Sequence, residues 1–335
     1  MRCLLLSLPL AAMSFAALGG GVARADVRAA IRDQILPGYA ALTDASRKLA
    51  EQGAQDCTVA AMQPEWNAAF DAWLDVAYLR LGPVEEEGRA LAFAFWPDPK
   101  AIGRRQLQAL KETADRDHIT PEAMSQGSIA TRGFFGMYHL LYGEMAQDDA
   151  FSCALRQAQA EDLAQMAMAT EIGWQNGFAD QLLNPGAQGK TRYLDEAEAR
   201  QALYTQLISG LEFNKDQRLG RPLGSFDRPR PERAEMIEAG RSAENLDRSL
   251  QSLERFAQAL AQGMGPIPNT TAAFARAHEL VADLEDPVFA GVASPGERLR
   301  VEILQQQIAL TVEAVDQELG PLLGVSAGFN AADGD

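Results

Sequence analysis

Residues 64–83 read PEWNAAFDAWLDVAYLRLGP, and their large apolar side chains return at intervals of three and four positions. That spacing, from Trp66 through Trp73 to Leu81, places one apolar stripe along a single helix. Pro64 suits the first turn of such a helix because an N–H there has no intrahelical partner, and the closing Gly-Pro pair stops it. The pattern therefore predicts one helix from residue 64 to residue 81.

The same periodicity recurs along almost the whole chain. A Ser-Pro-Gly-Glu capping box at residues 294–297 opens a helix that is expected to stop at Gly320-Pro321. Further helices are expected at residues 26–54, 99–115, 121–145, 149–183, 192–214, 231–262 and 270–284. No run alternates like a strand between hairpin turns. The predicted fold class is all-α, built as two bundles of the four-helix type.

Two irregular stretches interrupt this pattern, GPVEEEGRALAFAFWPDPK at residues 82–100 and GRPLGSFDRPRP at residues 220–231. Both are too rich in Gly and Pro to be helical throughout. Each follows an apolar helix, which favours an ancient duplication of one bundle, and we expect both at the cleft between the bundles. The LNPG turn at residues 183–186 is the predicted boundary between bundles at 26–185 and 186–335.

The chain is acidic, with 46 Asp and Glu against 30 Lys and Arg and a formal net charge of −16. Phosphate contacts need clustered basic side chains, so the charge argues against a nucleic-acid partner and an anionic membrane surface. The hydrophobic content of 47% is that of a globular protein and excludes a disordered one.

The first 25 residues have the pattern of a secretory signal peptide. Arg2 precedes an apolar stretch at residues 4–18, and Ala23-Arg24-Ala25 fits a small-x-small cleavage site. Cleavage after Ala25 removes two arginines and no acid, so the net charge becomes −18. We expect a periplasmic protein, and no later stretch is apolar enough to span a membrane.

Removal of the signal peptide leaves two cysteines, Cys57 and Cys153. An exported compartment is oxidising, so an even pair predicts a disulfide. The bridge would close a loop of about 97 residues and stabilise the fold by on the order of 4–5 kcal/mol in the chain-entropy model. Two separate buried thiols are the alternative.

Common catalytic motifs are missing from the sequence. It has no HExxH or ExxH pair, no GxSxG and no P-loop, and its three histidines (His118, His139 and His278) are far apart. No catalytic residue is assigned on this basis.

Residues 131–143, TRGFFGMYHLLYG, resemble the signature helix of the imelysin family. Further matches include the FWPD motif at residues 95–98, Asn214, RPLG at residues 221–224 and GFNAADGD at residues 328–335. The resemblance implies an exported all-α protein of two bundles with a cleft between them. It also implies an iron-acquisition setting and classification as a metallopeptidase.

The match departs from the family signature, Gly-x-His-x-x-Glu. Gly133 is in place, but Phe135 and Tyr138 occupy the His and Glu positions. His139 is the next residue along, rotated by about 100° on the helix. It is the one candidate ligand that the stretch offers to an iron or zinc ion.

Several residues are candidates to line the cleft. Phe135 and Tyr138 share a helix face, although that face can equally pack in the core. Trp96 and Asp98 lie in a loop stiffened by two prolines, and Asp98 can instead cap the following helix. The set also includes positive side chains, which can hold an anion or tie the loop to acidic helices: Arg132, Arg221 and Arg228.

Together these features predict an exported protein that handles a metal or small ligand in the cell envelope, within iron uptake, and that is not a peptidase. One alternative is a zinc-dependent peptidase of the imelysin type, with a metal held by His139 and carboxylates. Another is an interaction module for a transporter or redox partner, which would expose a large apolar patch.

Overall fold

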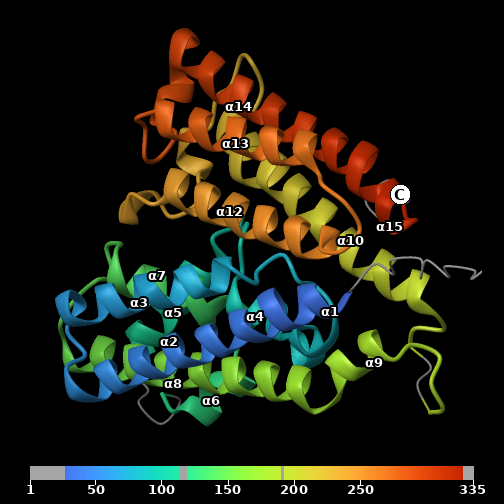
Figure 1. The fold of residues 1–335 in the computed structure, drawn as a ribbon. Helices are drawn as coiled ribbons and strands as arrows, with labels where there is room; N and C mark the ends of the chain where they lie inside the picture. The colour runs from blue at the N-terminus through green and yellow to red at the C-terminus, as the bar shows by residue number, and fades with distance from the viewer. Residues whose placement is uncertain (1–26, 114–118, 190–191, 327–335) are drawn as a thin grey trace, which may run out of the picture.

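A computed structural model describes residues 27–113, 119–189 and 192–326 of the chain. In these ranges the chain is helical, and its one β-type contact is an isolated bridge between Ser225 and Arg228. The helices form two bundles, one above the other in Figure 1. The predicted all-α class is therefore confirmed.

The lower bundle holds the helices before residue 184, with α2 packed against α3 and α8 (Figure 1). Its aromatic core centres on Trp66, which lies 5.3 Å from Phe70 and 6.3 Å from Phe134 between ring centroids. The helices are α1 (Val27–Ala30), α2 (Leu36–Gln55), α3 (Val59–Leu74), α4 (Arg89–Phe93), α5 (Ile102–Thr113), α6 (Pro121–Gln126), α7 (Gly133–Leu141), α8 (Ala150–Gly173) and α9 (Ala179–Leu183).

The upper bundle holds the helices after residue 195. Its outer pair, α13 and α14, pack along each other, and α12 faces the lower bundle (Figure 1). The helices are α10 (Glu196–Phe213), α11 (Gly220–Leu223), α12 (Ser242–Ala261), α13 (Pro268–Asp283), α14 (Pro295–Ala314) and α15 (Gly320–Leu323). A π-helical turn, Asn214–Leu219, joins α10 to α11.

The helix predicted for residues 64–81 is wrong at both ends. It begins five residues earlier, so Pro64 lies inside α3, and it ends at Leu74. Asp75, the next residue, is held by the upper bundle: its carboxylate binds Arg248 and Arg255, at 2.9 and 2.6 Å, and its carbonyl accepts from Ser252. These tertiary contacts fix a turn where the apolar periodicity alone would continue the helix.

The helix predicted for residues 121–145 is broken in two, and the second half starts at Gly133. Gly133 has a φ of +62°, and a Cβ there would overlap the carbonyl oxygens of Ala92 and Phe93. Only glycine combines that backbone conformation with such close approach. The glycine of the sequence signature thus seats α7 directly on the end of α4.

Two other helix boundaries also differ from the prediction. Residues 231–241 form short 3-10 turns, so α12 begins only at Ser242. At the start of α14 the Ser294 hydroxyl donates to the Gly291 carbonyl instead of capping the helix, so the capping box is absent. The last helix continues past residue 320 and ends at Gly324, which has a left-handed φ of +67°.

The predicted disulfide between Cys57 and Cys153 is confirmed, with their Cα atoms 5.3 Å apart. It ties the start of α3 to the first turn of α8 across 96 positions of sequence. The bridge therefore lies within the lower bundle.

Charged pairs join the two bundles along α3 and α12. Arg241, just before α12, binds Asp71, and its other guanidinium nitrogen donates to Asn67. Together with the pairs of Asp75, these contacts set arginines of the upper bundle against carboxylates of the lower one. A single cluster of buried apolar side chains also runs through both bundles, so the division into two domains at residue 185 stays a prediction.

None of the helices in the described ranges is long and apolar enough to cross a membrane. The predicted signal peptide, His118 and the motif at residues 328–335 lie outside the described residues.

Candidate functional site

A cleft of about 710 Å³ opens between the bundles, and we call it the outer cleft. The lower bundle contributes the loop after α4, the start of α5 and one face of α7, while the upper bundle contributes α11 and the segment before α12. Most residues proposed from the sequence line it: Trp96, Asp98, Phe135, Tyr138, His139 and Arg221. The two irregular stretches therefore meet at this cleft.

Trp96 forms an aromatic wall of the outer cleft. Its indole stacks on the ring of Phe135, with centroids 6.1 Å apart and planes 15° apart, and meets the ring of Phe213 edge-on at 5.9 Å. The guanidinium of Arg221 lies 5.8 Å from the indole centre. Trp96 thus joins residues of both bundles and supports a cation at the cleft surface.

Tyr138 links the bundles through its hydroxyl, which accepts a hydrogen bond of 3.1 Å from the backbone N–H of Glu238. Its side chain is buried, while part of the residue faces the cleft. The hydroxyl proton is still available to a ligand, because accepting one bond leaves the O–H free to donate.

Asp98 has one engaged and one unengaged carboxylate oxygen. Oδ2 accepts a hydrogen bond of 2.8 Å from the N–H of Gly103, in the first turn of α5. This oxygen therefore caps the helix, which is one of the two roles expected of Asp98. Oδ1 is buried and has no hydrogen-bond partner among the described residues.

Three arginines line the outer cleft without an ion-pair partner among the described residues. Within the described residues, no hydrogen bond or ion pair to a side chain is found for the guanidinium groups of Arg104, Arg221 and Arg233. Burial and the neighbouring charge of Arg233 lower the pKa of Arg221 below its ordinary value. The carboxylates at the same cleft, such as Glu232 and Glu238, form no ion pair with these three arginines. Their guanidinium N–H groups are therefore available to an anion.

A family model described as imelysin (Peptidase M75) matches residues 35–314 of the sequence. The chain belongs to the imelysin family. Its fold is also similar to the crystal structure of an imelysin-like protein from Psychrobacter arcticus 273-4, with a TM-score of 0.77 and 19% sequence identity. That similarity covers 90% of this chain and 96% of the other. Among curated proteins, none matches the sequence significantly.

The metal donors expected of an imelysin signature do not assemble in this chain. Phe135 and Tyr138 occupy the His and Glu positions, and no group of three or more His, Cys, Asp or Glu side chains in the described ranges is placed to hold a metal. His139 does face the outer cleft, where burial and the positive charge of Arg104 lower its pKa. Its neutral imidazole is at most a single ligand, so the donor set does not fit a resident iron or zinc ion.

Two of the candidate arginines lie elsewhere. Arg132 is buried and forms a two-pronged ion pair with Asp162, with N–O distances of 2.9 and 2.7 Å, which fixes the start of α7 on α8. Arg228 is exposed on the loop after α11 and does not line the outer cleft. The structure therefore brings together five of the seven proposed cleft residues.

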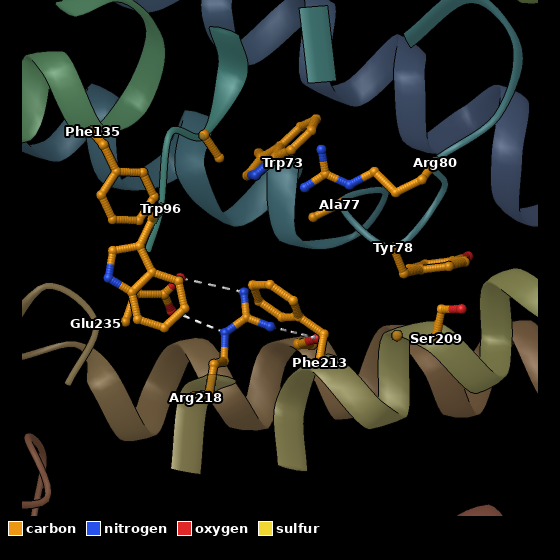
Figure 2. A pocket seen from close by; sticks show the side chains of 13 residues that line it. Trp73, Ala77, Tyr78, Arg80, Trp96, Phe135, Ser209, Phe213, Arg218 and Glu235 are labelled. Carbon is orange, nitrogen blue, oxygen red and sulfur yellow. Dashed lines mark hydrogen bonds and ion pairs between the residues drawn. The ribbon is translucent and has the colours of Figure 1, made fainter. Parts of the chain in front are cut away.

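Behind Trp96 and Phe135 lies a second space of about 180 Å³, which we call the inner chamber. Figure 2 shows its lining, with Arg80 and Trp73 on the lower-bundle side and Arg218 and Phe213 on the upper-bundle side. Arg218 binds Glu235, with an Nε–Oε2 distance of 3.0 Å (Figure 2). The Nη1 of Arg218 donates to the side-chain oxygen of Asn214, at 2.6 Å, and to the hydroxyl of Ser249.

The charged residues of this chamber were not among those predicted from the sequence. Arg80 is the one basic residue in the stretch 64–83, and that isolation among apolar neighbours was a usable signal. Arg218 carried no comparable signal, because its direction depends on the π-helical turn that contains it. Such turns occur often at functional sites, but a sequence pattern does not reveal them.

Proposed function

We propose that this imelysin-like chain is an exported binding protein of the cell envelope that holds a small anionic ligand in the outer cleft, and that it is not a peptidase. The observation that carries the proposal is the set of three unpaired arginines, Arg104, Arg221 and Arg233, in one cleft of a chain with a net charge of −16. The three side chains approach one cleft from both bundles, so a single small anion could contact more than one of them.

The chemistry of the cleft favours a hydroxy-carboxylate. Guanidinium groups bind carboxylates through two parallel hydrogen bonds, and three of them suit a ligand with several carboxylates. Asp98 lines the cleft as a carboxylate that could accept from a ligand hydroxyl, and the Tyr138 hydroxyl can donate. The cleft volume of about 710 Å³ lies within the range of roughly 300–1,000 Å³ that is common for ligand pockets.

The same cleft chemistry also suggests how the protein could take part in iron uptake. The donor set does not hold a bare ion, so iron would enter as cargo, already wrapped by a carboxylate chelator. A ferric hydroxy-carboxylate complex presents outward-facing carboxylate oxygens, which the arginines can bind. In that case the protein recognises the chelator and leaves the metal's own ligands in place.

Calorimetric titration of the chain from Asp26 onward tests the proposal, with citrate, ferric citrate and Zn²⁺ as the three probes. We expect citrate or ferric citrate to bind, and Arg221→Gln to weaken that binding at least tenfold, or about 1.4 kcal/mol. The matched control is Arg228→Gln, which removes an exposed arginine seven positions further along the chain, in the loop after α11, and should change little.

The affinity should also fall as salt is added, because the ligand is held by charge. The proposal fails if neither citrate probe binds, or if the two variants lose affinity equally. Stoichiometric zinc with cleavage of a peptide substrate would establish the peptidase alternative instead.

A further inference from the structure

The inner chamber is lined by a cation, Arg80, that has no ion-pair partner among the described residues. Arg80 extends into it with its guanidinium 5.6 Å from the ring centre of Trp73 (Figure 2). The residue is exposed to solvent, and it lines one side of the chamber. Within the described residues the guanidinium has no hydrogen bond or ion pair, while the backbone N–H of Arg80 donates to Gln206 at 2.6 Å.

Two charges act on Arg80 through space, and neither forms an ion pair with it. The negative charge of Glu85 favours the Arg80 cation, and the positive charge of Arg218 has a smaller, opposite effect. Arg218 itself already has partners, since it donates hydrogen bonds to Glu235, Asn214 and Ser249. The guanidinium of Arg80 therefore keeps its N–H donors free for an anion that enters the chamber.

Most of the remaining lining is apolar or aromatic, and its polar members are Ser209, Ser249 and the Arg218–Glu235 pair. Trp73, Trp96, Phe135 and Phe213 surround the space, with Ala77 at one side (Figure 2). Its volume of about 180 Å³ can be compared with an engineered apolar cavity of ~150 Å³ that binds benzene. The chamber therefore has room for one ring or a short aliphatic body attached to an anionic group.

We propose that the inner chamber is a separate binding site for a small apolar monocarboxylate, such as an aromatic acid. Its carboxylate pairs with the guanidinium of Arg80, and its apolar body packs between Trp73, Trp96 and Phe213. This ligand differs in class from the hydrophilic polycarboxylate of the outer cleft. The inference stands whether or not the outer cleft binds citrate.

Titration with benzoate tests the inference on the chain from Asp26 onward, and benzyl alcohol is the uncharged ligand of matched size. We expect benzoate to bind and benzyl alcohol to bind at least tenfold more weakly. Arg80→Gln should weaken benzoate at least tenfold, and Arg80→Lys should retain part of the affinity because it keeps the charge. Ala77→Leu should abolish binding by filling the space.

The two sites are distinguished by crossing the variants with the ligands. Arg221→Gln should weaken citrate and leave benzoate unchanged, while Arg80→Gln should do the reverse. Thermal melts establish that each variant is folded, and the comparison of benzoate with benzyl alcohol needs no variant at all. The inference is overturned if benzoate does not bind, if benzyl alcohol binds equally well, or if Arg80→Gln retains full affinity. Any of these results would mean that the chamber holds only water beside Arg80.

Discussion

Trp96 stacks on Phe135, and this pair of rings forms a common wall of the outer cleft and the inner chamber. Trp96 comes from the loop after α4, and Phe135 comes from α7. The same two rings therefore line both spaces on this side. A change at either ring should alter both spaces, whereas a change at Arg221 or Arg80 should alter one.

Trp96 should report ligand binding in the outer cleft by its fluorescence. Trp66 and Trp174 are fully buried in the lower bundle, and Trp73 lines only the inner chamber. We expect citrate to change the tryptophan emission of the natural chain, and Trp96→Phe to remove that change. The variant should still bind citrate within a few-fold by calorimetry. An unaltered emission change in Trp96→Phe would place the ligand elsewhere.

Arg132 should matter for stability and not for binding. Arg132→Met leaves the buried carboxylate of Asp162 without its partner, which should cost about 3–5 kcal/mol of the free energy of unfolding. Urea denaturation measures this change. Citrate affinity of the folded variant should equal that of the natural chain.

A second variant separates charge from packing at the same position. Replacing both partners, as Arg132→Met with Asp162→Leu, should recover much of the loss because no buried charge is left unpaired. If the double variant is as unstable as the single one, the ion pair is not the cause.

His278 should make the upper bundle more stable at mildly acidic pH. Its Nδ1 lies 2.6 Å from Asp247 and its Nε2 lies 3.4 Å from Glu254, and the hydrogen bond to Asp247 is the main cause that raises its pKa. A raised pKa favours the folded state below the unfolded value of about 6.5, and this contribution is lost as pH rises through the folded value. Thermal melts of the natural chain and of His278→Gln should therefore differ most in acid and converge in base. A difference that grows with pH would contradict this assignment.

Reduction of the disulfide should destabilise the lower bundle without changing its fold. The bridge between Cys57 and Cys153 closes a loop of 96 positions, for which the chain-entropy model gives about 4–5 kcal/mol. Thermal melts with and without a reductant measure the loss in the natural chain. The double variant Cys57→Ser with Cys153→Ser is the control, since a reductant should leave its melting temperature unchanged.

The periodicity of apolar residues was sufficient to predict the helical class, because it reflects one buried face of each helix. It misjudged the end of α3, where Asp75 is held by Arg248 and Arg255 from a helix far along the chain. It also missed the late start of α12, where Met236 takes a left-handed conformation with a φ of 54°. The first error comes from contacts between distant segments, and the second comes from a backbone conformation that apolar periodicity does not encode.

The candidate site was predictable where rigid loops and the signature helix supplied the residues. Trp96 and Tyr138 line the outer cleft because their segments are fixed by prolines and by Gly133. Arg132 was wrongly proposed as a cleft residue. The sequence beside the signature does not show whether a positive residue forms an ion pair with a buried carboxylate. Arg80 was overlooked because its role depends on the absence of a partner in space, which a sequence does not reveal.

The charges along α3 and α12 have a consequence for how the two halves of the chain could find each other. Asp71 and Asp75 belong to one half, while their partners Arg241, Arg248 and Arg255 belong to the other. A chain divided in the turn after α9 would give two polypeptides with opposite charge at their shared face. Such fragments should reassemble by complementation at low ionic strength and separate more readily in salt.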